Sequence, residues 1–83
     1  MIIRYFAWIR ERLNRDQQEL ALPESVQTVA DALDHLRATD EDFAAILPPE
    51  TVFRVALDDE LVELDTPLGN AKELSIFPPM TGG

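Results

Sequence analysis

The last two residues, Gly82 and Gly83, are the first candidates for chemistry. Only 3 glycines occur in 83 residues, so a pair at one end is an unusual use of this residue. Because glycine has no Cβ, the pair can pass through a narrow channel in a partner protein. The reactive group would be the carboxylate of Gly83, which accepts a sulfur or amine nucleophile once it is joined to AMP as an acyl adenylate. The end of the chain is therefore predicted to be a tethered substrate.

The residues before the glycines are suited to holding that carboxylate away from the body. Pro78 and Pro79 favour an extended backbone and remove two hydrogen-bond donors, so we expect the chain to leave the sheet there. Residues 78–83 can then reach roughly 20 Å. We predict one domain over residues 1–77 and an extended tail over 78–83. The tail or channel residues are Pro78, Pro79, Met80, Thr81 and Gly82, and they lead to Gly83.

No side-chain active site is recognisable in the sequence. His35 follows Asp34 on the polar side of a predicted helix, which is typical of a solvated residue. Asp58, Asp59 and Glu60 are contiguous and lack the spacing of a calcium-binding loop. The chain has no cysteine, which excludes a thiol nucleophile and thiolate metal ligands. We expect no metal and no permanently bound cofactor.

The chain is strongly acidic, with 16 Asp and Glu against 7 Lys and Arg and a formal net charge of -9. This charge would repel a nucleic-acid backbone, so nucleic acid is not an expected partner. It suits docking to a basic protein surface, although solubility alone is an equal explanation. No apolar run approaches the roughly 20 residues that cross a bilayer, and no membrane association is expected. We expect a cytoplasmic protein.

The pattern of apolar residues predicts an α+β fold, in which a mixed sheet of four to five strands packs on one main helix. Alternation predicts strands over residues 2–8, 17–22 and 73–77, and a hairpin over 52–64 that turns at Asp58 and Asp59. The main helix is predicted to begin at Thr28, which stands in capping-box spacing with Asp31. Its apolar positions are Val29, Ala32, Leu33 and Leu36. A helical turn over 8–14 and a second short helix from residue 40 complete the elements.

Three segments resemble the small subunit of molybdopterin synthase, the MoaD family of ubiquitin-like sulfur carriers with the β-grasp fold. They are FAWIRE (6–11), VALDDELVELDTPL (55–68) and ELSIFPPMTGG (73–83). The last is the most specific, because the family typically ends in Pro-Pro, an aliphatic residue, Ser or Thr, and Gly-Gly. Two turns depart from the family pattern: Asp58 replaces the usual Asn, and GNAKE (69–73) replaces a more usual Asp-Gly-Asp-Glu.

The resemblance implies that Gly83 is adenylated by an E1-like enzyme of the MoeB type, which consumes ATP, and is then converted to a thiocarboxylate. The tail would enter the large synthase subunit, of the MoaE type, and donate sulfur to cyclic pyranopterin monophosphate. The chain would be a substrate-like subunit of a heterotetramer and would not be catalytic alone.

The resemblance also implies a partner interface near the tail. Its expected residues are Phe77, Leu61, Phe6 and Arg10, with Met80 of the tail beside them. Alternation along the last strand leaves open that Phe77 belongs to the core instead.

Two other functional classes stay open at this point. The chain could be a carrier of the same fold that serves thiamine thiazole synthesis or tRNA thiolation. It could also be a ubiquitin-like interaction module whose glycines are never activated. The length of the chain and its Pro-Pro pair favour the molybdopterin synthase reading over the thiazole carriers.

Overall fold

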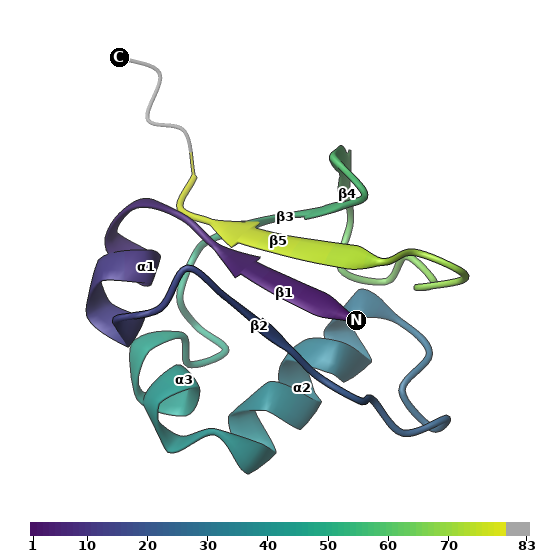
Figure 1. Cartoon of the computed structure of the whole chain (residues 1–83), viewed down its shortest axis with the longest axis horizontal. Coiled ribbons are helices and arrows are strands. Elements are labelled where there is room, and N and C mark those ends of the chain that lie inside the picture. Colours follow the sequence, from purple (N-terminus) through teal and green to yellow (C-terminus); the bar gives the residue numbers. More distant parts are fainter. Residues whose placement is uncertain (80–83) are drawn as a thin grey trace.

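Strands from the two ends of the chain lie side by side in the sheet (Figure 1). The computed structural model describes residues 1–79. Strand β1 (Ile2–Tyr5) runs parallel to β5 (Glu73–Phe77), and β2 (Gln17–Glu19) pairs antiparallel with the other side of β1. Strand β3 (Arg54–Leu57) is antiparallel to β5, and β4 (Glu60–Val62) is antiparallel to β3. The order β2-β1-β5-β3-β4 makes a mixed five-stranded sheet, as the sequence predicts.

Three helices lie on one side of this sheet (Figure 1): α1 (Ala7–Leu13), α2 (Val29–Thr39) and α3 (Glu41–Ile46). The predicted capping box begins α2. The Thr28 side chain accepts a hydrogen bond from the Asp31 backbone N–H, and the Asp31 carboxylate accepts one from the Thr28 backbone N–H, both at 3.1 Å. All four apolar positions predicted for this helix are buried: Val29, Ala32, Leu33 and Leu36. The sheet and the three helices form the α+β architecture expected from the sequence.

The core lies between the sheet and the helices. Alternate strand residues such as Ile3, Tyr5, Leu74 and Ile76 point into it and are almost fully buried. Phe43 of α3 fills the space beneath them. Since the three helices of residues 1–79 all lie on this side, none of them covers the other face of the sheet (Figure 1). Among residues 1–79, no helix is long and apolar enough to cross a membrane.

The first strand is shorter than predicted. It ends at Tyr5 rather than continuing to Trp8, because the chain turns into α1 at Ala7, whose φ is 53°. Left-handed backbone is uncommon for alanine, so nothing in the sequence signals this turn. The helical turn predicted over residues 8–14 corresponds to α1, which Asn14 ends in a left-handed conformation. Strand β2 also ends early, at Glu19.

The predicted hairpin turn is formed by two left-handed residues, Asp58 with φ 46° and Asp59 with φ 70°. The Asp58 carboxylate also accepts two hydrogen bonds from the backbone of a distant segment. Its Oδ1 accepts hydrogen bonds from the backbone N–H groups of Lys72 and Glu73, both at 3.0 Å. Asp58 therefore links the β3–β4 turn to the start of β5. The side-chain carbonyl oxygen of an asparagine at this position could accept the same two hydrogen bonds.

Candidate functional site

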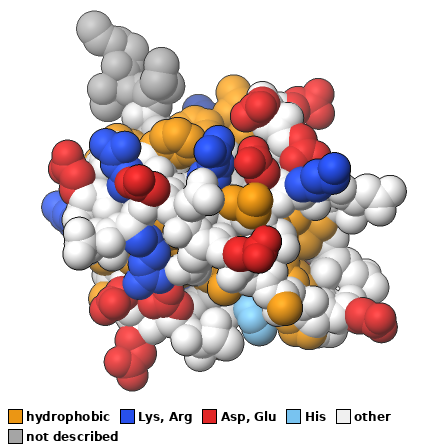
Figure 2. Space-filling view, in the orientation of Figure 1, with side chains coloured by type: hydrophobic (Ala, Val, Ile, Leu, Met, Phe, Trp, Pro, Cys, Tyr) orange, Lys and Arg blue, Asp and Glu red, His pale blue; other side chains and the backbone are white. Residues whose placement is uncertain are grey.

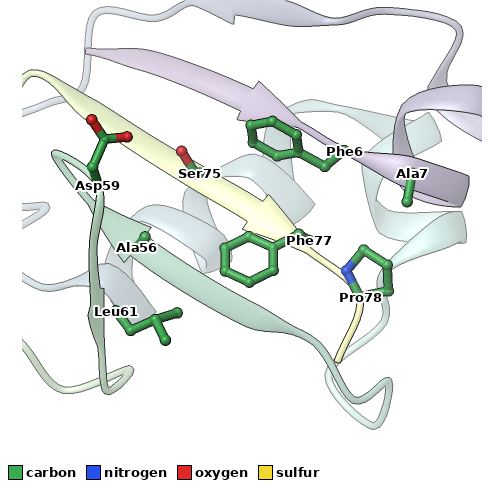
Figure 3. A pocket seen from close by; sticks show the side chains of 8 residues that line it. All are labelled: Phe6, Ala7, Ala56, Asp59, Leu61, Ser75, Phe77 and Pro78. Carbon is green, nitrogen blue, oxygen red and sulfur yellow. The ribbon is translucent and has the colours of Figure 1, made fainter. Parts of the chain in front are cut away.

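An apolar hollow lies on the uncovered face of the sheet, where β5 ends (Figure 3). Its volume is about 450 Å³. The lining residues are Phe6, Ala7, Ala56, Asp59, Leu61, Ser75, Phe77 and Pro78. Every strand position among them has the parity opposite to that of the core residues, so the hollow and the core occupy the two faces of the sheet.

Large apolar side chains form the walls of this hollow. Phe6 is 42% exposed and Leu61 is 67% exposed, although water disfavours such surface. The Phe77 ring packs edge to face against Phe6, with centroids 6.2 Å apart. Phe77 is half-buried, so it is not part of the fully buried core. Exposed apolar groups that gather around a concavity mark an interaction surface.

The floor of the hollow is made of two small residues on neighbouring strands. Ala56 of β3 and Ser75 of β5 are directly paired in register, and both are more than nine-tenths buried. Leu61 of β4 is the register partner of Ala56 on its other side. The hollow exists because small residues stand where the surrounding walls are large. Its shape suits a protruding apolar side chain of a partner.

The structure brings together four of the residues that the sequence assigns to the interface or the tail: Phe6, Leu61, Phe77 and Pro78. Arg10 is not among the lining residues. Arg10 lies on α1, and its half-exposed side chain is 3.8 Å from the Asp16 carboxylate. Pro79 follows Pro78 and is half-buried. The predicted residues Met80, Thr81, Gly82 and Gly83 lie outside the described residues.

Four lining residues are absent from the sequence-based site: Ala7, Ala56, Asp59 and Ser75. Ala56 and Ser75 carry no functional group that stands out in a sequence, and their role depends on strand register. Asp59 is recognisable only as a turn residue. A signal for Ala56 and Ser75 exists in hindsight, since both alternate with large core residues on the same strand.

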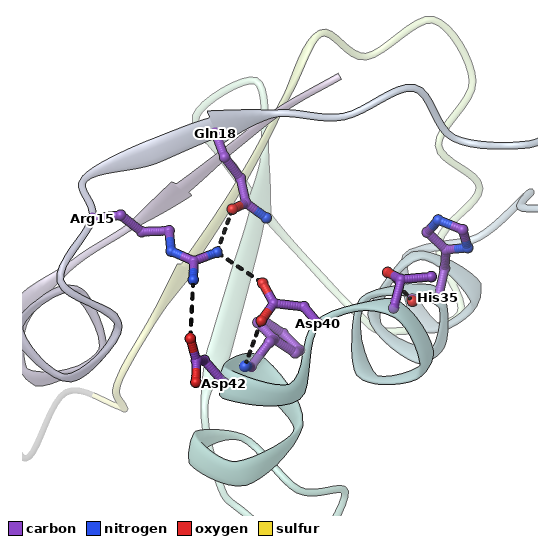
Figure 4. Close-up of polar contacts among 7 residues, drawn as sticks. Arg15, Gln18, His35, Asp40 and Asp42 are labelled. Atoms are coloured by element: carbon purple, nitrogen blue, oxygen red, sulfur yellow. Dashed lines mark hydrogen bonds and ion pairs between the residues drawn. The ribbon is translucent and has the colours of Figure 1, made fainter.

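A separate polar cluster lies at the other face, where α3 begins (Figure 4). Arg15 donates to the Asp40 carboxylate at 2.7 Å and lies 3.6 Å from that of Asp42. Asp40 also caps α3 by accepting from the Phe43 N–H. Burial alone would raise the pKa of Asp40, but the bonds from Phe43 and Arg15 hold it below its usual value. This cluster fastens α3 to the segment before β2.

Two further titratable side chains, those of His35 and Tyr5, lie outside the apolar hollow. His35 lies on α2, where its backbone carbonyl accepts a hydrogen bond from the Thr39 hydroxyl. Burial raises the pKa of Tyr5 to about 12, so its hydroxyl stays neutral. Within residues 1–79, no three His, Asp or Glu side chains are grouped closely enough to hold a metal ion.

The family assignment follows from comparison with known proteins. The model of the ThiS family matches residues 3–83. The chain belongs to the ThiS family. This member is 33% identical over 79 residues to the molybdopterin synthase sulfur carrier subunit of Escherichia coli (strain K12), and the match covers 95% of this chain and 94% of that one. The resemblance to MoaD-type sulfur carriers is thereby confirmed.

Solved structures confirm the ubiquitin-like β-grasp fold of this ThiS-family chain. SAMP1 from Haloferax volcanii superposes with a TM-score of 0.76 at 23% identity, covering 99% of this chain and 97% of that one. A Pyrococcus furiosus protein assigned as molybdopterin converting factor subunit 1 gives a TM-score of 0.73 at 25% identity, covering 95% of both chains. The first likeness concerns the fold alone.

Proposed function

We propose that this protein is the sulfur-carrier subunit of a molybdopterin synthase, with sulfur held as a thiocarboxylate at Gly83. The observation that carries the proposal is the apolar hollow between Phe6, Leu61 and Phe77, which Pro78 borders at the root of the tail. A carrier needs such a surface, because a partner must grip the body while the tail enters its active site. The name of the 33% identical relative supports molybdopterin synthase as the destination.

The chemistry proceeds in two stages at the Gly83 carboxylate. In the first, a carboxylate oxygen attacks the α-phosphate of ATP and pyrophosphate leaves, giving the acyl adenylate. A sulfur nucleophile supplied by the activating system then attacks the acyl carbon and AMP leaves. When the nucleophile is hydrosulfide, this exchange of a carbon–oxygen bond for a carbon–sulfur bond gives the thiocarboxylate directly. When it is a persulfide, a thiol reductant must also cleave the S–S bond of the acyl disulfide. No cysteine of the chain is needed for this stage.

In the second stage the thiocarboxylate sulfur forms a bond to a carbon of cyclic pyranopterin monophosphate. A carbon–oxygen bond at that carbon breaks, the oxygen leaves as water or with the phosphate group, and carrier and pterin are joined through a thioester. Water attacks the acyl carbon and breaks the bond from acyl carbon to sulfur. The sulfur stays on the pterin, and the Gly83 carboxylate is regenerated. Two such deliveries supply the two sulfurs of the product.

The large subunit, of the MoaE type, provides the catalytic groups and the site for the anionic pterin. A carrier with a net charge of -9 is a poor anion-binding surface. Its own contribution is proximity, since a tethered group held in a partner's pocket can have an effective molarity of order 10⁵ M or more. We propose a heterotetramer of two small and two large subunits, each small chain serving one site. The E1-like activating enzyme, of the MoeB type, is the other partner.

Intact-mass measurement tests the carrier function. The full chain is incubated with the E1-like enzyme, ATP and a sulfur source, and the expected product has one carboxylate oxygen replaced by sulfur. The loaded chain is then mixed with the large subunit and cyclic pyranopterin monophosphate. Formation of molybdopterin supports the proposal. A chain that is never loaded would instead be a non-activated interaction module, and a loaded chain that yields no molybdopterin would serve thiamine thiazole synthesis or tRNA thiolation.

A further inference from the structure

Charge is distributed unevenly around the apolar hollow. Among the described residues, Asp59 is the only ionisable one that lines it, and it lies at the hairpin end, opposite Pro78 (Figure 3). Acidic side chains also gather over the β3–β4 hairpin, to one side of a strip of hydrophobic side chains (Figure 2). The hollow therefore has an acidic end and a tail end.

The carboxylates at the acidic end differ in their availability. Asp58 is engaged inside the chain, because its Oδ1 accepts from the Lys72 and Glu73 backbone N–H groups. Within residues 1–79, the side chains of Asp59 and Glu60 form no ion pair. The charge on Asp59 is thus free to interact with a partner that covers the hollow.

The opposite end of the same face carries a cation. Arg54 is the register partner of Phe77, and it has the same parity as Ala56, so its exposed side chain lies on the face of the hollow. It makes no ion pair within the described part of the chain. From Asp59 to Arg54 the charge changes from negative to positive. The other charges of this face lie near a group of opposite sign, since Arg4 is 3.9 Å from Glu73 and Glu63 lines a small pocket together with Arg54.

We propose that this polarity orients docking, with the partner inserting an apolar side chain into the hollow and placing a lysine or arginine beside it against Asp59. The inference rests on the proposed function, since the partner meant is the large synthase subunit. The overall charge of -9 attracts a basic surface from any direction and cannot set an orientation. A pair at Asp59 can, because docking turned end for end would bring the partner's cation toward Arg54.

The occupant of the hollow is therefore a basic protein surface with a protruding apolar side chain. A second copy of this chain does not fit that description, because two bodies of charge -9 repel each other. The correct orientation directs Pro78 and the residues after it toward the partner's active-site channel. Asp59 would act as a positioning residue and take no part in the chemistry.

Binding kinetics with the purified large subunit test this inference, using Asp59→Asn and the control Glu24→Gln. Asparagine tolerates the left-handed conformation of position 59, and thermal unfolding verifies that the fold is kept. Glu24 is an exposed carboxylate in the segment between β2 and α2, away from the lining residues, and its change removes the same charge. Each protein is measured at low and high ionic strength.

Asp59→Asn should raise Kd about tenfold at low ionic strength and flatten its salt dependence, whereas Glu24→Gln should change Kd less than twofold. Equal effects of the two variants, or no effect of Asp59→Asn on a wild-type chain that binds, would overturn the orienting role alone. Failure of the wild-type chain to bind the large subunit would overturn the proposed function as well.

Discussion

The ring of Phe6 meets the ring of Phe77 edge to face, with centroids 6.2 Å apart and planes at 87°. Phe6 follows the first strand and Phe77 ends the last one, so the pair joins the two ends of the folded body. Such pairs contribute about 0.5–1.5 kcal/mol beyond the area that they bury. The contact holds both rings in place at the rim of the hollow, ready for a partner. Pro78 follows Phe77 directly, so this contact lies where the tail begins.

Leu61→Ala should weaken binding to the large subunit without affecting the fold. Leu61 is 67% exposed, so we expect its truncation to change the free energy of unfolding by no more than about 0.5 kcal/mol. Loss of a wall of the hollow should weaken binding about tenfold or more, measured by calorimetric titration. Leu64→Ala is the matched control, because Leu64 is also an exposed leucine and does not line this hollow. Equal losses of affinity in both variants would contradict the interface.

Phe77→Ala separates the interface role from a core role. Phe43 is fully buried, so Phe43→Ala should lower the free energy of unfolding by about 3–5 kcal/mol. Phe77 is only half-buried, and its truncation should lower this free energy by less while weakening partner binding. Calorimetric unfolding of each isolated variant provides the comparison. A loss for Phe77→Ala as large as that for Phe43→Ala would place Phe77 in the core instead.

Removing Gly83, or adding one residue after it, should abolish thiocarboxylate formation and sulfur transfer. The reacting carboxylate would then stand at the wrong distance from the body. The midpoint of thermal unfolding should stay unchanged, because neither change alters the core. Gly82→Ala should slow the partner reactions more than it lowers stability, since a Cβ narrows the fit in a channel. Normal molybdopterin formation by the shortened chain would refute the carrier mechanism.

Tyr5→Phe should remove a source of instability in alkali. Burial raises the pKa of Tyr5 to about 12, whereas the pKa of a tyrosine in the unfolded chain is about 10. The stabilising effect of the neutral form is therefore complete below pH about 10 and is lost as the pH rises from there toward 12. Urea unfolding over this range should show a steeper decline for the wild type than for the variant.

At neutral pH the same substitution should be harmless. The Tyr5 hydroxyl is buried and makes no hydrogen bond of good geometry within residues 1–79, although the Gln18 side chain lies close enough to offset part of the rise in its pKa. An unsatisfied buried hydroxyl destabilises, so its removal should leave the free energy of unfolding unchanged or raise it by up to about 1 kcal/mol. A loss of more than about 1 kcal/mol at pH 7 would show that the hydroxyl does bond to a protein group.

Local signals account for what the sequence predicted well. The Thr28 capping box and the spacing of apolar residues define α2 without reference to the rest of the chain. The same holds for the Asp58 turn, whose two left-handed residues are of a type that tolerates this conformation. The early end of β1 was missed because Ala7 adopts a positive φ that alanine does not favour.

The hollow could be predicted only in part. Phe6, Leu61 and Phe77 were expected to share a surface because of a family resemblance, and nothing in their spacing requires it. The floor depends on the register that sets Ala56 against Ser75, and register between distant strands is decided by the whole sheet. Arg10 was expected at the interface, but it lies on α1 outside the lining, and its role there stays a prediction.

The parallel pairing of β1 with β5 has a consequence for how the protein is made. The strand that carries the tail is also the middle strand of the sheet, and it is the last strand to leave the ribosome. A nascent chain that stops before β5 lacks the partner of both β1 and β3, so it cannot close its core. Folding must wait for these late, long-range contacts. A chain truncated before β5 should therefore remain unfolded, so a body without its tail-bearing strand should not accumulate as a folded protein.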